Sequence, residues 1–182
     1  DPIAVVRDGR FLVRDQPAAG DADDLVRFGR AADLPLLGDW NGDGVLTPGV
    51  RRDGRFLLRN SRSGGPADVA FTYGRADDLP IAGDWDGDGT DEIGVVRDGR
   101  FLLRTSLDAG PANLAFTYGR ADDLPIAGDW DGDGTDEIGV VRDGRFLLRT
   151  SLDAGPANLA FTYGRADDLP IAGDWDGDGT DE

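Results

Sequence analysis

The sequence contains no cysteine, histidine, methionine or lysine, and all 19 of its basic residues are arginines. Without cysteine there is no disulfide from which a redox compartment could be inferred. Ser-His and Cys-His dyads and Schiff-base lysines are excluded as well. Hydrolysis by a carboxylate pair is the remaining option. The paired acids are better explained as metal ligands, as argued below, and we therefore expect that the protein is not an enzyme.

Long apolar runs and basic patches are also missing. No stretch approaches the roughly 18 apolar residues of a membrane span, and no signal peptide is recognisable. The net charge of −17 disfavours a nucleic-acid partner, because phosphate binding requires a basic face. Nearly half of the 36 Asp and Glu residues lie in four short loops, so the acidity is concentrated where a cation could neutralise it.

A 45-residue repeat covers nearly the whole chain and is marked by one Trp-containing acidic loop in each copy. The four units span residues 3–47, 48–92, 93–137 and 138–182, and the last two are identical. The first unit is the most divergent. We treat residues 1–182 as a single repeat domain.

Each unit contains four short apolar stretches separated by turn signals and no helical period. In one copy these expected strands are residues 79–85, 93–97, 101–104 and 114–119, with Asp98-Gly99 as a two-residue hairpin turn. Their nearly continuous apolar character suggests burial on both faces. Four strands per repeat of this length are typical of a β-propeller blade. The predicted fold is all-β: a closed four-bladed ring, or half of an eight-bladed ring formed by a homodimer.

The acidic loops contain the candidate metal ligands. In the second unit Asp84, Asp86 and Asp88 alternate and Glu92 follows, so that several carboxylates can converge on a hard cation such as calcium. Thr90 would add its main-chain carbonyl. An EF-hand needs a Glu at the twelfth loop position, which is Val95 here. The alternative interpretation is a solvated acidic turn, because Asp-Gly pairs are common in hairpins.

The same ligand pattern recurs in every unit, with one weaker copy. The first loop has an amide at its third position and no closing Glu, so we expect lower affinity there. The candidate ligands are Asp39, Asn41, Asp43 and Val45 in the first loop; Asp84, Asp86, Asp88, Thr90 and Glu92 in the second; Asp129, Asp131, Asp133, Thr135 and Glu137 in the third; and Asp174, Asp176, Asp178, Thr180 and Glu182 in the fourth.

Two other features recur. Trp40, Trp85, Trp130 and Trp175 are expected to pack between blades, although stacking on sugars is the alternative. The Arg75 to Leu79 segment suggests a solvated loop with a local Arg–Asp pair, and a ligand-binding rim is the alternative.

The run from Gly83 to Val95, followed by Arg97 to Phe101, resembles the FG-GAP and VCBS-type repeats of secreted and surface proteins, especially actinobacterial ones. The resemblance covers all four units. It implies a β-propeller with calcium in the loop between the first two strands of each blade. The implied function is a non-catalytic calcium-binding module that is structural or binds a protein or other ligand in an extracellular protein. The alternative is a carbohydrate-binding propeller lectin.

The two ends of the chain share one repeat register, because Asp1-Pro2-Ile3 aligns with Asp136-Glu137-Ile138. We therefore expect the C-terminal stretch 169–175 to be the strand that completes the first blade. Completion within one chain gives a monomer, and completion between two chains gives a homodimer.

Overall fold

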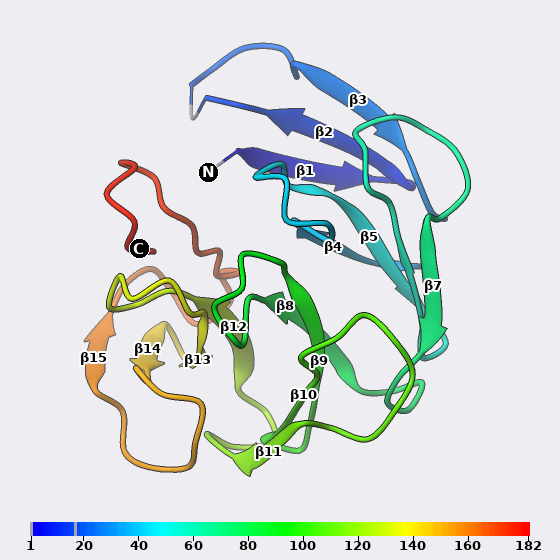
Figure 1. The fold of residues 1–182 in the computed structure, drawn as a ribbon. Helices are drawn as coiled ribbons and strands as arrows, with labels where there is room; N and C mark the ends of the chain where they lie inside the picture. The colour runs from blue at the N-terminus through cyan, green and yellow to red at the C-terminus, as the bar shows by residue number, and fades with distance from the viewer. Residues whose placement is uncertain (1, 17) are drawn as a thin grey trace.

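The computed structural model describes residues 2–16 and 18–182 as strands, turns and loops. Four antiparallel sheets form the blades of a four-bladed β-propeller (Figure 1). The predicted fold class is confirmed. No helix among the described residues is long and apolar enough to cross a membrane.

Each blade is built from consecutive strands, and neighbouring strands of a sheet are always neighbours in sequence. Blade 1 consists of β1 (Ile3–Arg7), β2 (Arg10–Arg14) and β3 (Asp24–Arg27). Blade 2 consists of β4 (Leu34–Gly38), β5 (Thr47–Arg52), β6 (Arg55–Leu58) and β7 (Val69–Thr72). Blade 3 consists of β8 (Leu79–Gly83), β9 (Glu92–Arg97), β10 (Arg100–Leu103) and β11 (Leu114–Thr117). Blade 4 consists of β12 (Leu124–Gly128), β13 (Glu137–Arg142), β14 (Arg145–Leu148) and β15 (Leu159–Thr162).

The Asp-Gly pairs form the expected two-residue hairpins. Asp98 and Gly99 both have positive φ angles, +50° and +75°, as a type I′ turn requires at its two central positions. The turn fixes the register that pairs Arg97 with Arg100. The same pair of positive angles occurs in all four units, so one local signal sets the corresponding hairpin in every blade: β1–β2 in blade 1, and the second hairpin in blades 2, 3 and 4.

The second strand of each complete blade is buried on both faces, as its apolar run predicts. In β9, Ile93 and Val95 are fully buried and Val96 is 7% exposed. The outer strands β7 and β11 instead alternate between half-buried and exposed residues. The core therefore lies between blades, and it is densest around the second and third strands.

Blades pack through two unlike faces. The aromatic face of blade 3 includes Trp85, Phe101 and Tyr118, and it forms one buried cluster with Ile138 and Val140 of blade 4. We call the opposite side of a blade, which in blade 4 carries Ile138 and Val140, the aliphatic face. The contact between blades 2 and 3 follows the same scheme. Phe101 and Phe116 are stacked, with ring centroids 5.7 Å apart.

In each complete blade, a buried Asp just before the first strand forms an ion pair with an Arg at the end of the second strand. Asp78 precedes β8, and its carboxylate is bound by Arg97 from the end of β9 at 2.7 Å. Burial alone would raise the pKa of Asp78, but hydrogen bonds from Arg97 and from the Arg75 main-chain N–H hold this pKa below its ordinary value. The expectation of a solvated local pair in this segment is wrong, because the Asp78 side chain is fully buried and its partner lies 19 residues away.

Blade 1 differs from the others, because it has three strands. Residues 169–175 were expected to complete it, but within the described part of the chain they belong to no strand. They run as an irregular tail between blade 4 and the N-terminal region (Figure 1). Ala172 of this tail packs against the aromatic face of blade 4. The register match that involves Asp1 lies outside the described residues.

Candidate metal sites in the blade loops

The first three acidic loops connect the first and second strands of blades 2, 3 and 4, and the fourth follows the irregular tail. Glycines make the tight path possible: Gly87 and Gly89 adopt φ angles of +74° and +86°, which are strained for residues with a Cβ. The loop starts after β8 and returns at Glu92, the first residue of β9. Because Gly83 and Glu92 are paired in the sheet, both ends of the loop are held by the strand ladder.

Asp84 organises the loop from inside. Its Oδ1 accepts hydrogen bonds from the main-chain N–H groups of Gly87 and Asp88, and its Oδ2 accepts one from Gly89. Asp88 accepts a hydrogen bond from the Thr90 N–H at 2.8 Å. A carboxylate offers about four acceptor positions, so Asp84 retains the capacity to bind a cation while it shapes the loop.

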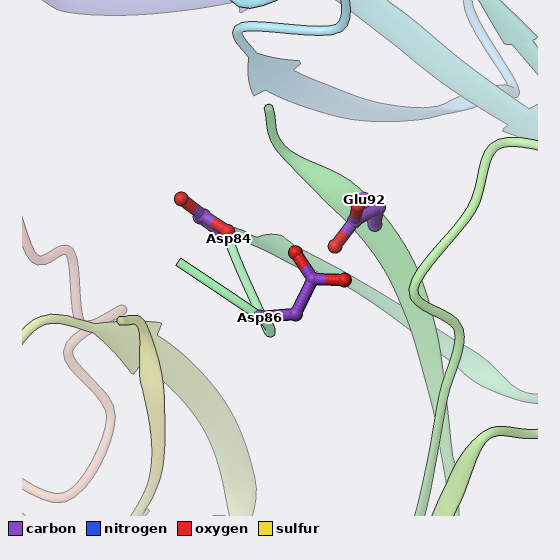
Figure 2. A group of neighbouring side chains, drawn as sticks. All are labelled: Asp84, Asp86 and Glu92. Atoms are coloured by element: carbon purple, nitrogen blue, oxygen red, sulfur yellow. The ribbon is translucent and has the colours of Figure 1, made fainter. Parts of the chain in front are cut away.

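Three carboxylates converge in the second loop. One oxygen from each of Asp84, Asp86 and Glu92 lies within 4.8 Å of the others. Figure 2 shows the Asp86 and Glu92 carboxylates turned toward each other across the loop. An ion bound at the typical calcium–oxygen distance of about 2.3–2.6 Å can be reached by three oxygens at this separation. Asp88 is outside this group, and the Thr90 carbonyl stays a prediction.

The third and fourth loops repeat this arrangement with one variation. Asp129, Asp131 and Glu137 form the group in the third loop. In the fourth loop the group is Asp174, Asp176 and Asp178. Asp133 and Glu182 lie outside the converging groups, and the main-chain carbonyls of Thr135 and Thr180 stay predictions. Each group contains three acids, so three loops bring together carboxylates that could hold a metal ion.

The first loop has a different interior. Asn41 donates its amide N–H to Asp43 at 2.9 Å. Asp39 accepts the Gly44 N–H at 2.6 Å, and Thr47 uses its hydroxyl to reach the Gly38 carbonyl. Among the described residues of this loop there is no group of three converging acids. The position of Val45 offers only a main-chain carbonyl, which remains a prediction.

Burial and mutual repulsion perturb the acids of the complete loops. Glu92 is 3% exposed, and burial followed by the charge of Asp86 raises its pKa to about 8. Burial likewise raises the pKa of Glu137 to about 7. The pKa of Asp86 is raised by burial and by the neighbouring charges of Asp88 and Asp84. A bound cation would offset these costs, since it favours the ionised form of every carboxylate around it.

Sequence reasoning missed a set of contacts between successive loops. Asp91 accepts the Asp39 N–H at 2.6 Å and donates its own N–H to the Asp39 carbonyl at 2.8 Å. Asp136 makes the same two contacts with Asp84. Asp181 continues the series with Asp129. The missed signal was an acid at the eighth loop position in three units, replaced by Leu46 in the first.

These contacts gather acids around the centre of the ring. A cavity of about 470 Å³ there is lined by residues of all four loops, including Asp91, Asp136 and Asp181. Burial raises the pKa of Asp136 to about 8, and the next largest cause is the charge of Asp91. Burial raises the pKa of Asp91 to about 6. The hydrogen bonds between loops therefore join adjacent blades, but they bring buried acidic side chains close to one another.

Three of the four tryptophans are buried in the blade contacts. Trp40, Trp85 and Trp130 are 3%, 2% and 5% exposed. The Trp40 Nε1–H donates to the Thr47 carbonyl at 3.1 Å, which ties the end of the first loop to its beginning. These three rings pack in the hydrophobic core, and none of them presents a face for a sugar.

No family model, no curated protein and no solved structure matches this chain. The resemblance to FG-GAP and VCBS-type repeats therefore stays a prediction from the loop motif.

Proposed function

We propose that the chain is a non-catalytic calcium-binding β-propeller module with a structural or ligand-binding role in a secreted or surface protein. The observation that supports the ion is the convergence of three carboxylates within 4.8 Å in each of three loops. Calcium accepts six to eight oxygen ligands in flexible geometry, whereas magnesium demands a near-ideal octahedron and retains several waters. A glycine-rich loop on a strand hairpin suits the first requirement better.

The role of the ion would be to hold the ring together. Each acidic loop contacts the next one through main-chain and Asp hydrogen bonds. A cation that neutralises one loop therefore stabilises the neighbouring contact as well. Extracellular calcium modules work with Kd values of about 10⁻⁴–10⁻³ M, so sites of low affinity would be sufficient in a secreted or surface protein.

Calorimetric titration with calcium tests the proposal. We expect three sites of similar affinity and at most one weaker site, from the first loop. The substitution Asp86→Ala should remove one of the three and leave two, since each group is local to its loop. Asp43→Ala in the first loop is the matched control and should leave the three stronger sites unchanged. Absence of calcium binding at millimolar concentration would refute the proposed function.

A further inference from the structure

Blade 4 exposes the face that blades 2 and 3 bury. Tyr163 is 77% exposed, whereas its counterparts Tyr73 and Tyr118 are each 6% exposed. Phe161 is 48% exposed although it stacks on Phe146 as in the other blades, with centroids 5.1 Å apart. Because the repeats of blades 3 and 4 have the same sequence, the difference comes from what covers the face and not from its composition.

This face is hollowed into an apolar groove. A cavity of about 590 Å³ is lined by Trp130, Phe146, Leu148 and Phe161, and by Ile171 of the C-terminal tail. In blade 3 the corresponding surface is filled by the aliphatic face of the next blade. An apolar surface of this kind marks a site of interaction.

Blade 1 exposes the complementary face. Val5 is 55% exposed, whereas its counterparts Val50, Val95 and Val140 are between 0% and 2% exposed. Leu12, paired with Val5 in the sheet, belongs to the same aliphatic face. The molecule therefore presents one aromatic and one aliphatic face at once, the two partners that are buried together at each internal blade contact.

The two open faces also carry charges of opposite sign at the positions of the ion pair found in the complete blades. Each complete blade pairs an Asp before its first strand with an Arg at the end of its second strand, as in Asp123–Arg142 at 2.6 Å. The repeat places Asp168 and Arg7 in these two positions at the open faces. Both residues are exposed, and no ion pair between them is present in the described part of the chain.

The C-terminal tail lies where the first strand of a following blade would lie. Ala172 of the tail packs on the aromatic face of blade 4, as Ala127 packs on the face of blade 3. The tail thus occupies the place of the inner strand of a following blade. By the register of Leu124 with Val141, Leu169 would pair with Val6 of a β1 strand, yet residues 169–175 form no ladder with their own β1.

We propose that the aromatic face and tail of blade 4 bind the aliphatic face of blade 1 from a second copy of this chain, sealed by an ion pair between Asp168 and the second copy's Arg7. The seam repeats the contact that joins blades within the chain. It does not depend on the identity of the ion in the acidic loops. Two reciprocal seams close a dimer, and a single seam propagates longer assemblies.

The first part of the test is the molar mass of the full chain, by sedimentation equilibrium up to about 1 mM protein, where even weak specific association is populated. We expect two chains or more. Phe161→Glu should raise the dissociation constant at least tenfold. Leu79→Glu, a matched change at another exposed strand residue (43% exposed), should not alter it. A monomeric wild-type protein over the whole range, or equal masses for the two variants, would overturn the proposal.

The second part separates closure between chains from closure within one chain. Arg7→Asp and Asp168→Arg should each weaken association at least tenfold, because each places like charges at the seam. An equimolar mixture of the two variants places opposite charges at both seams and should restore association to the wild-type level. Each variant alone, at the same total protein concentration, is the control and should stay dissociated. Failure of the first mixture to associate would overturn the proposal.

Discussion

Removal of calcium should lower the thermal stability of the protein by an amount that follows from the number of complete loops. With a Kd of about 10⁻⁴ M and about 2 mM free calcium, each occupied site adds roughly 1.8 kcal/mol to the free energy of unfolding. Three converging acid groups give about 5 kcal/mol. For a chain of this size each kcal/mol shifts Tm by about 2–4 °C, so chelation should lower Tm by about 10–20 °C.

Differential scanning calorimetry in calcium and in excess chelator, at equal ionic strength, measures this shift, and magnesium at the same concentration should give a smaller one. The informative variant replaces Asp86, Asp131 and Asp176 together by Asn. It removes one repelling charge from each group, so its Tm in chelator should exceed that of the wild type, while its response to calcium should be largely lost. Identical wild-type melting curves with and without calcium would refute the reasoning.

Three further predictions concern the electrostatics and packing of the blades. The ion-free protein should lose stability as the pH rises from about 4.5 to about 8. Burial raises the pKa of Glu92 to about 8 in the folded state, whereas the unfolded state loses that proton at a lower pH. Calcium affinity should increase over the same pH window, which calorimetric titrations at both ends of the window would check. Arg97→Met leaves the buried Asp78 carboxylate without its partner and should cost about 2–3 kcal/mol in urea unfolding, whereas Arg100→Met, on an exposed residue, should cost less than about 0.5 kcal/mol. Gly94→Ala would place its Cβ 2.5 Å from a buried leucine methyl group and should cost about 1–3 kcal/mol through overpacking; an unfolding midpoint equal to that of the wild type would contradict this.

The features that depend on local chemistry could be predicted from the sequence. The hairpin at Asp98-Gly99 follows from the φ angles that an Asp-Gly pair tolerates, and the strands follow from apolar runs between such turns. The convergence of Asp84, Asp86 and Glu92 also follows from a single loop, since all three residues lie within nine positions. These predictions needed no knowledge of how the blades are arranged.

The features that depend on ring geometry could not be predicted. The contact between Asp91 and Asp39 joins residues 52 positions apart and exists only because adjacent blades bring their loops together. The sequence repeat suggested that residues 169–175 would form a strand with β1, but identical residues take different environments when a neighbouring blade is absent. The exposure of Tyr163 against Tyr118 shows this directly.

The central claim is that three acidic loops of this propeller each hold a calcium ion. A crystal structure grown in millimolar calcium, with anomalous diffraction recorded at a wavelength where calcium scatters anomalously, tests it most directly. We predict one anomalous peak inside each of the second, third and fourth loops, bound by Asp86, Asp131 and Asp176 and their neighbouring acids. Three loops that hold only water, with the carboxylates in the same places, would contradict the claim.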